Sequence, residues 1–364
     1  MPATTQQRPL VSTSLIRVCS TASTRIREVD FSNLGFGKVF SDHMFVAEYD
    51  GTKWTNMRIM PYGKLMMSPA MSALHYGQAI FEGLKAFRND NDEVFVFRPW
   101  KNAQRLNESA DRMCMPDVPE ELFLDAITEL VSMDRDWIPR KEGESLYIRP
   151  VMFATDEYVG VRPSETYMFF IFTCPVGRYY SGELKVKIEN KYTRASKGGT
   201  GHSKAAGNYA ASLWPTKKAQ EEGYNQILWT DGLTHEYFEE SGTMNVVFRA
   251  GNVIMTPMIT DSILDGVTRD SVLTLARDWG YQVEERRVSV KEITDLLKEG
   301  KLDEAFGVGT AATVAPIRTI GYQGTNYDLR PSADWEFAPR AQKELDLIKQ
   351  GLVPDTHDWI LRIP

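Results

Sequence analysis

Lys204 stands where residue types and spacing most favour covalent chemistry. It follows the glycines of the segment Ser196–Gly207 and precedes a helical pattern over Ala210–Glu222. A lysine held between a flexible loop and a packed helix can be desolvated, which lowers its pKa and frees the amine to form a Schiff base. Most lysines are instead surface charges, so this interpretation depends on what the rest of the chain supplies.

An amine of this kind suits an aldehyde cofactor such as pyridoxal phosphate. That cofactor also needs a carboxylate at its pyridine nitrogen, a cup for its phosphate and a partner for its ring hydroxyl. Glu240 is the candidate carboxylate, because it lies at the mouth of a predicted hairpin where Gly242 lets the backbone approach a ligand closely. The alternative for Glu240 is a solvated acid beside Glu239.

Two segments could hold a phosphate or a carboxylate. Val267 and Thr268 lie in the first turn of a helix predicted over Gly266–Trp279, whose free N–H groups and dipole favour an anion. The Gly-Thr turn Gly309–Ala312 can offer the hydroxyl of Thr310 and backbone N–H groups. An ordinary capped helix and a simple turn are the structural alternatives.

The composition favours a globular protein with a small-molecule partner. The chain has 364 residues, enough for about two domains, and 42% of them are hydrophobic. Its net charge of −7 argues against a sequence-independent nucleic-acid binder, and no apolar run approaches the roughly 18 residues of a membrane span. The three cysteines and five histidines lack metal-site spacing, so no metal is predicted.

Residues 1–30 are predicted to be an N-terminal leader whose composition is compatible with disorder. No acid precedes Glu28, whereas four arginines and many serines and threonines do. This composition is compatible with a mitochondrial transit peptide, but no clear amphipathic helix accompanies it. We therefore expect a cytoplasmic protein, with the mitochondrial matrix as the alternative.

The elements that must position these residues alternate between strands and helices, which indicates an α/β (α+β) fold. In the first half, helical patterns cover 98–113 and 120–133 between strand patterns. Cys174–Gly182 has a proline and two glycines between strand patterns, as expected of a domain boundary. The predicted division is a smaller α/β domain over 31–176, a linker over 177–183 and a larger cofactor-binding domain over 184–364.

Taken together, these segments resemble the branched-chain amino-acid aminotransferases, which belong to the pyridoxal-phosphate class IV family. The same motifs occur in the same order from Phe36 to about Ile317. The resemblance implies the D-amino-acid-aminotransferase-like fold (fold type IV), with two domains, a pseudo-barrel in the second and pyridoxal 5'-phosphate between them.

The resemblance also implies the cofactor contacts. Lys204, in Lys-Ala-Ala-Gly-Asn-Tyr, resembles the Schiff-base lysine, and Tyr209 the tyrosine at the ring hydroxyl. Glu240 matches the glutamate at the pyridine nitrogen in the motif Glu-x-Gly-Thr-x-Asn, with Thr243 behind the ring. The implied phosphate ligands are Arg105, Val267, Thr268 and Thr310.

The substrate pocket follows from the same resemblance. An aromatic wall suits an aliphatic side chain, while an arginine suits the second carboxylate of glutamate. The loop Val159-Gly160-Val161 resembles one that reaches into the pocket of a neighbouring subunit, which implies a homodimer. The implied substrate contacts are Phe36, Tyr76, Phe81, Tyr147 and Arg149, with Thr310 and Ala311 at the α-carboxylate.

One departure concerns redox control. Some animal members have a Cys-x-x-Cys pair after the Gly-Thr turn, whereas Ala312 and Ala315 occupy those places here, so a thiol switch is not expected at this point.

The predicted function is transfer of amino groups between branched-chain L-amino acids and 2-oxoglutarate. A transaminase for D-amino acids or aromatic substrates, or a lyase of the same fold, is the alternative within the class. A binding protein that kept the fold without turnover is the alternative outside it.

Overall fold

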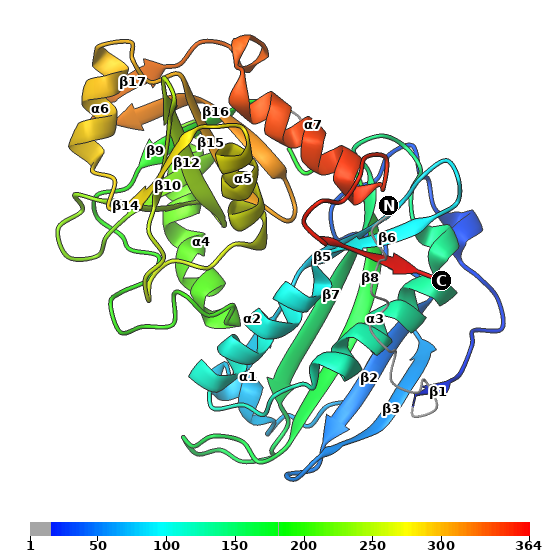
Figure 1. Cartoon of the computed structure of the whole chain (residues 1–364). Helices are drawn as coiled ribbons and strands as arrows, with labels where there is room; N and C mark the ends of the chain where they lie inside the picture. Colours follow the sequence, from blue (N-terminus) through cyan, green and yellow to red (C-terminus); the bar gives the residue numbers. More distant parts are fainter. Residues whose placement is uncertain (1–15, 181) are drawn as a thin grey trace.

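A computed structural model describes residues 16–180 and 182–364. Figure 1 shows two lobes, each built round a large β-sheet, with helix α7 and the C-terminal strand passing from the second lobe to the first. The helices are α1 (Ser72–Tyr76), α2 (Pro99–Arg112), α3 (Glu120–Met133), α4 (Ala206–Glu221), α5 (Val267–Asp278), α6 (Val290–Lys298) and α7 (Phe337–Lys349). No helix of the described residues is long and apolar enough to cross a membrane.

In the described residues the first sheet has nine strands, in the order β1-β3-β2-β8-β7-β5-β6-β18, with β4 also paired to β7. Apart from the parallel pair β1–β3, neighbouring strands are antiparallel. The strands are β1 (Arg17–Val18), β2 (His43–Tyr49), β3 (Trp54–Pro61), β4 (Ala79–Phe81), β5 (Leu84–Arg88), β6 (Val94–Phe97), β7 (Ser145–Ala154), β8 (Tyr167–Val176) and β18 (Ile360–Ile363).

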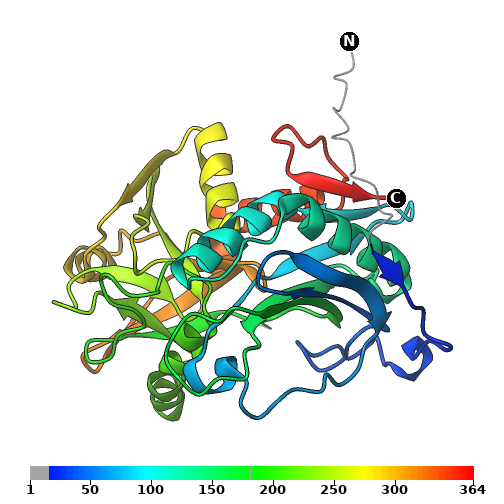
Figure 2. The ribbon, with the colours of Figure 1, turned by 90° about the horizontal axis from the view of Figure 1, so that it is seen from below.

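Helices α2 and α3 lie side by side over one face of this sheet (Figure 2). Leu106 on α2 and Phe123 on α3 are fully buried, and the Phe123 ring stacks on Phe169 of β8 at 6.2 Å. The helical patterns predicted over 98–113 and 120–133 are therefore confirmed, because their apolar faces have a sheet to pack against.

The second sheet closes on itself. In the described residues β11 pairs with both β10 and β12, so that β9, β10, β11, β12, β15 and β16 form a six-strand ring, and β13, β14 and β17 extend it. This ring is the expected pseudo-barrel. Its strands and extensions are β9 (Leu184–Ile188), β10 (Gln226–Thr230), β11 (Phe238–Ser241), β12 (Met244–Ala250), β13 (Val253–Pro257), β14 (Gln282–Arg286), β15 (Glu304–Gly309), β16 (Thr313–Tyr322) and β17 (Thr325–Asp328).

The strand pairing differs from the predicted division at both ends of the chain. Strand β18 pairs with β6 of the first sheet, although it falls in the range 184–364 assigned to the second domain. Strand β1 pairs with β3, and Arg25 forms an ion pair with Asp42 at 3.4 Å, although both β1 and Arg25 fall in the predicted leader. Residues 1–15 of the leader and residue 181 of the linker lie outside the described residues.

Candidate active site

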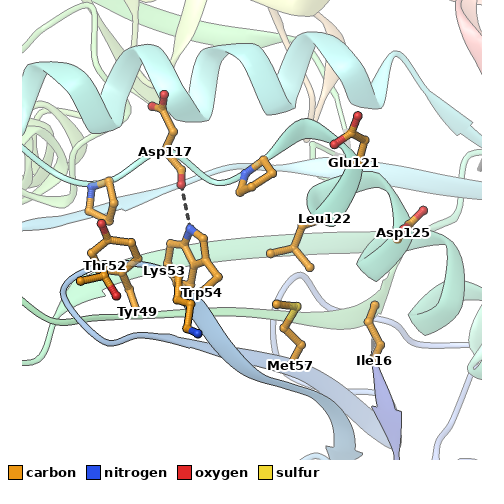
Figure 3. Close-up of a pocket in the computed structure, with 12 residues that line it drawn as sticks. Ile16, Tyr49, Thr52, Lys53, Trp54, Met57, Asp117, Glu121, Leu122 and Asp125 are labelled. Atoms are coloured by element: carbon orange, nitrogen blue, oxygen red, sulfur yellow. Dashed lines mark hydrogen bonds between the residues drawn. The ribbon is translucent and has the colours of Figure 1, made fainter. Parts of the chain in front are cut away.

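The described residues line at least two cavities with the size of a small-molecule site. One, of about 570 Å³, lies between the β2–β3 hairpin and the start of α3, where Trp54 donates its indole N–H to the carbonyl of Asp117 (Figure 3). None of the predicted site residues lines it. The other, of about 520 Å³, is lined from both sheets by Lys204 and by most of those residues, so it is the candidate active site.

Lys204 is held in place by its own backbone. It lies two residues before α4, its N–H donates to Ser109 Oγ of α2 at 2.9 Å, and its carbonyl accepts from the N–H of Phe81 at 3.1 Å. The side chain points into the cavity, with Nζ 3.1 Å from the hydroxyl of Tyr209 in the first turn of α4. The amine and the tyrosine are therefore positioned by the first sheet and α4 together.

Glu240 is a buried carboxylate on β11, in the wall that the second sheet forms. It is 3% exposed, and its Oε1 accepts from the N–H of Leu264 at 2.8 Å and lies 3.1 Å from Arg194 Nη2. Burial raises the pKa of Glu240, while the charge of Arg194 and the Leu264 N–H oppose that rise. A carboxylate with these partners can hold a positive charge or a proton on a ring nitrogen next to it.

The neighbouring Glu239 points away from the cavity. It accepts from Ser262 Oγ, but its second oxygen, Oε2, is buried without a hydrogen-bond partner. Burial, together with the charge of Glu240, raises the pKa of Glu239 to about 7. Of the two adjacent acids, Glu240 is the one that reaches the candidate site.

Arg105 on α2 is fixed by Glu82, a residue with no exposed surface. Its Nε and Nη2 donate to the two Glu82 oxygens, each at 2.8 Å, and Asn102 donates to the same carboxylate at 2.7 Å. Burial would raise the pKa of Glu82, but the Arg105 charge keeps it below its usual value. A bidentate pair of this kind holds the guanidinium rigidly at the cavity wall, where it can meet a phosphate.

Helix α5 begins at the same wall. Val267 and Thr268 are its first two residues, so their backbone N–H groups have no partner within the helix. Asn245 donates to the carbonyl of Leu264 at 2.9 Å, and a Cβ at Gly266 would lie only 2.0 Å from the Asn245 oxygen. The close packing of Asn245 on Gly266 therefore sets the direction of the N-terminus of α5. The free N–H groups at this N-terminus favour an anionic ligand.

The substrate side of the cavity is aromatic. The Phe36 ring packs edge-on against Tyr147 and against Tyr179, each at 4.9 Å. Arg149 donates to the Tyr147 hydroxyl at 2.9 Å and lies 4.6 Å from the centre of the Phe81 ring. No described carboxylate forms an ion pair with Arg149, so its charge is available to a ligand.

The structure brings together most of the residues predicted from sequence. Those lining the cavity are Phe36, Phe81, Arg105, Tyr147, Arg149, Lys204, Tyr209, Glu240, Thr243, Val267, Thr268, Thr310 and Ala311. Tyr76 does not line it: this residue ends α1 with 43% of its surface exposed. Val159, Gly160 and Val161 do not line it either, and Val161 is 87% exposed.

Four residues that support the site were not singled out from sequence. Glu82 stands alone as an acid in the apolar run 79–87, which was a usable signal for a buried partner. Asn245 is the last residue of the motif Glu-x-Gly-Thr-x-Asn, and Tyr179 lies in the linker predicted over 177–183. Arg194 carried no signal, because its partner Glu240 is 46 positions away in the chain.

The site fits pyridoxal phosphate on chemical grounds, since an amine, a buried carboxylate, a tyrosine hydroxyl and an anion cup surround one cavity. The class IV amino-transferase family model matches residues 79–320. The chain is also 44% identical over 345 residues to branched-chain-amino-acid aminotransferase 2 of Bacillus subtilis (strain 168), covering 94% of this chain and 95% of that one. This chain belongs to the branched-chain aminotransferases of class IV.

Further similarities agree with this membership. The branched-chain-amino-acid aminotransferase of Mycolicibacterium smegmatis is 39% identical over 351 residues, which cover 94% of this chain and 95% of that one. Among solved structures, the branched-chain aminotransferase of Thermoproteus uzoniensis with norvaline has a TM-score of 0.74 at 24% identity, covering 88% of this chain and all of that one. The Escherichia coli enzyme has a TM-score of 0.71 at 24% identity, covering 88% of this chain and 99% of that one. The aminotransferase therefore has fold type IV and takes pyridoxal phosphate as its cofactor.

Proposed function

We propose that this aminotransferase exchanges amino groups between the branched-chain L-amino acids leucine, isoleucine and valine and 2-oxoglutarate, which becomes L-glutamate. The observation that carries the proposal is Arg149, a cation without a described carboxylate partner, set among Phe81 and Tyr147 in the cavity that Lys204 enters. The aromatic rings favour an aliphatic side chain, and the guanidinium favours the second carboxylate of glutamate. The names of the relatives in Bacillus subtilis and Mycolicibacterium smegmatis support branched-chain amino acids as one side of this exchange.

The residues divide the work of the reaction between them. When bound, pyridoxal phosphate supplies an electron sink for the substrate's Cα. Glu240 would keep the ring nitrogen protonated, and Arg105 with the N–H groups of Val267 and Thr268 would hold the phosphate. Lys204 Nζ would take the proton from the substrate's Cα and pass it to the C4′ carbon of the cofactor, and the Tyr209 hydroxyl lies within hydrogen-bond distance of Nζ.

We also propose a homodimer in which the loop 159–161 of a second copy borders the pocket. Val159, Val161 and Tyr76 are exposed apolar side chains near one end of the first sheet, where the N–H of Ser72 donates to the carbonyl of Asp156 at 2.8 Å. Exposed apolar side chains that lie close together favour burial against another protein surface. A second copy would therefore give Tyr76 the substrate contact that a single chain does not provide.

The test is kcat/KM for a panel of L- and D-amino acids with 2-oxoglutarate. We expect leucine, isoleucine and valine to exceed L-alanine by about tenfold or more, since each buried CH₂ is worth about 0.8 kcal/mol. L-Glutamate should react as an amino donor, whereas L-aspartate, one methylene shorter, should react poorly. Preference for D-alanine, or for aspartate over leucine, would refute the branched-chain specificity while leaving the cofactor site intact.

A further inference from the structure

Arg98 is a buried arginine at the place where the first lobe meets helix α5 of the second. It is 5% exposed and lies between β6 and α2, directly before Pro99. It does not line the active-site cavity. A buried guanidinium is costly unless its donors are well paired. The groups that Arg98 binds therefore show which part of the molecule it holds in place.

Among the described residues, the acceptors of the Arg98 side chain all lie at the beginning of α5. Nη1 donates to the Ser271 hydroxyl at 2.7 Å and to the Val267 carbonyl at 3.4 Å. Nη2 donates to the Asp270 carboxylate at 2.6 Å. The Ser271 hydroxyl donates in turn to the Val267 carbonyl at 2.9 Å. The guanidinium therefore fixes the turn of α5 whose free N–H groups form the proposed phosphate site.

The backbone of Arg98 has an uncommon conformation. Its φ of 49° and ψ of 44° lie in the left-handed region, which residues other than glycine seldom adopt. The Arg98 N–H donates to the carbonyl of Trp359 at 2.6 Å, and Arg98 Cζ lies 5.1 Å from the centre of the Trp359 ring. A residue in this conformation persists where the surrounding contacts determine it, and here those contacts come from the C-terminal segment that leads into β18.

Arg105 holds the same region of the second lobe from further along α2. Its Nη1 donates to the carbonyl of Asp265 at 2.7 Å, just before α5 begins. The helix rises by about 10 Å between Arg98 and Arg105. Two arginines of one helix therefore hold the start of α5 at two separate points, and of these two only Arg105 lines the active-site cavity.

We propose that Arg98 is a positioning residue for the cofactor phosphate. By holding Val267 and Ser271 against the first lobe, it sets the distance between the first turn of α5 and Arg105. The N–H groups of one lobe and the guanidinium of the other can then bind the same anion. The proposal rests on the phosphate site proposed above at Val267 and Thr268, and it holds whichever amino acids are the substrates.

The experiment measures, for each holoenzyme, the rate of cofactor loss on dialysis and the phosphorus NMR signal of the bound cofactor. Arg98→Gln should lose the cofactor about tenfold faster than wild type, because it removes charge-assisted hydrogen bonds, and should show a shifted or broadened phosphorus signal. Arg98→Lys keeps the charge without the forked geometry and should lie between the two. Arg340→Gln is the matched control, since Arg340 lies 3.9 Å from the ring centre of Trp279 at the other end of α5, and it should follow wild type.

Two further variants separate the possible outcomes. Ser271→Ala removes one acceptor of Arg98 with little change in volume and should lose the cofactor about threefold faster, so the proposal is tested even if Arg98→Gln does not fold. Gly266→Ala disturbs the phosphate site directly and should alter the phosphorus signal.

A wild-type phosphorus signal and wild-type cofactor retention in both Arg98→Gln and Ser271→Ala, even with a lower Tm, would show that Arg98 is only structural and would overturn the proposal. If Gly266→Ala alters the signal in that case, the phosphate site itself stands. If Gly266→Ala also leaves the signal unchanged, the phosphate lies elsewhere and the role of Arg98 is refuted with it. None of these readouts depends on turnover, so they can fail while the proposed transamination stands.

Discussion

At the scale of single residues, the reacting amine depends on two backbone hydrogen bonds and one side-chain contact. Ser109 and Phe81 fix the main chain of Lys204, so the side chain has a defined origin from which to reach Tyr209. A lysine on an unrestrained loop would spend much of its time away from the substrate. The entropic cost of positioning the Lys204 amine is therefore borne when the protein folds, and not when the reaction occurs.

Lys204→Ala should remain folded and lose turnover by about 10³-fold or more, because the proton acceptor at the substrate's Cα is removed. Lys197→Ala is the control, since that lysine lies in the same glycine-rich segment and is exposed. Steady-state kcat with leucine and 2-oxoglutarate is the measurement. Near wild-type turnover in Lys204→Ala would contradict the assignment of the base.

Glu239 should make stability depend on pH. Its pKa is about 7 in the folded protein and near 4.5 when unfolded, so between these values the folded state binds the extra proton. The free energy of unfolding should therefore fall as pH rises from about 4.5 to about 7, by up to about 3 kcal/mol, and level off above that.

Glu239→Gln tests this dependence, because it removes the titration and keeps the shape. Urea unfolding at a series of pH values should show a flatter profile for Glu239→Gln than for wild type. The exposed Glu236→Gln, three residues earlier, should follow wild type. Parallel profiles for Glu239→Gln and wild type would show that Glu239 titrates normally.

At the scale of elements, the N-terminus of α5 is an anion cup because a glycine precedes it. Gly266 leaves room for the Asn245 side chain, which in turn holds the loop at Leu264 beside Glu240. One close contact therefore links the phosphate end of the site with the pyridine end. A substitution of Gly266 should therefore disturb both the phosphate end and the pyridine end of the site.

Gly266→Ala should weaken cofactor retention, because its Cβ would meet the Asn245 oxygen at 2.0 Å and force the helix start to move. The measurement is the rate of cofactor loss on dialysis, followed by absorbance, together with Tm of the cofactor-free protein. Gly63→Ala is the control, since the nearest atom to its Cβ is 4.0 Å away. Equal cofactor retention in both variants would argue against a tight cup at α5.

At the scale of the whole molecule, the active site exists because two sheets from different halves of the chain face each other. The first sheet supplies Tyr147 and Arg149, and the closed ring supplies Glu240 and the turn at Thr310. Strand β18 fastens the end of the chain back to β6. This return holds the two halves together by backbone hydrogen bonds as well as by side-chain packing.

Val161→Asp should convert the proposed homodimer into a monomer, because it places a charge on an 87% exposed apolar side chain that a second copy would bury. Sedimentation should give a mass near 41.3 kDa for the variant and about twice that for wild type. Leu233→Asp, at an 83% exposed position on the second lobe, should stay dimeric. A wild-type monomer would refute the proposed dimer and the place of Tyr76 in it.

The sequence by itself determined the local features that depend on neighbouring residues. Periodicity placed α2 and α3, and the start of α5 followed from Gly266 and the apolar pattern after it. The motifs around Lys204 and Glu240 pointed to the cofactor, since each motif is contiguous in the chain.

Only the tertiary structure decided which distant residues meet. Arg194 with Glu240, and β18 with β6, join positions separated by tens to hundreds of residues. Such pairings leave no periodic trace, because they depend on how whole sheets close and pack. For the same reason Tyr76 was predicted in the pocket yet lies outside it in the single chain: its motif is local, while its position relative to the cavity is set by the fold.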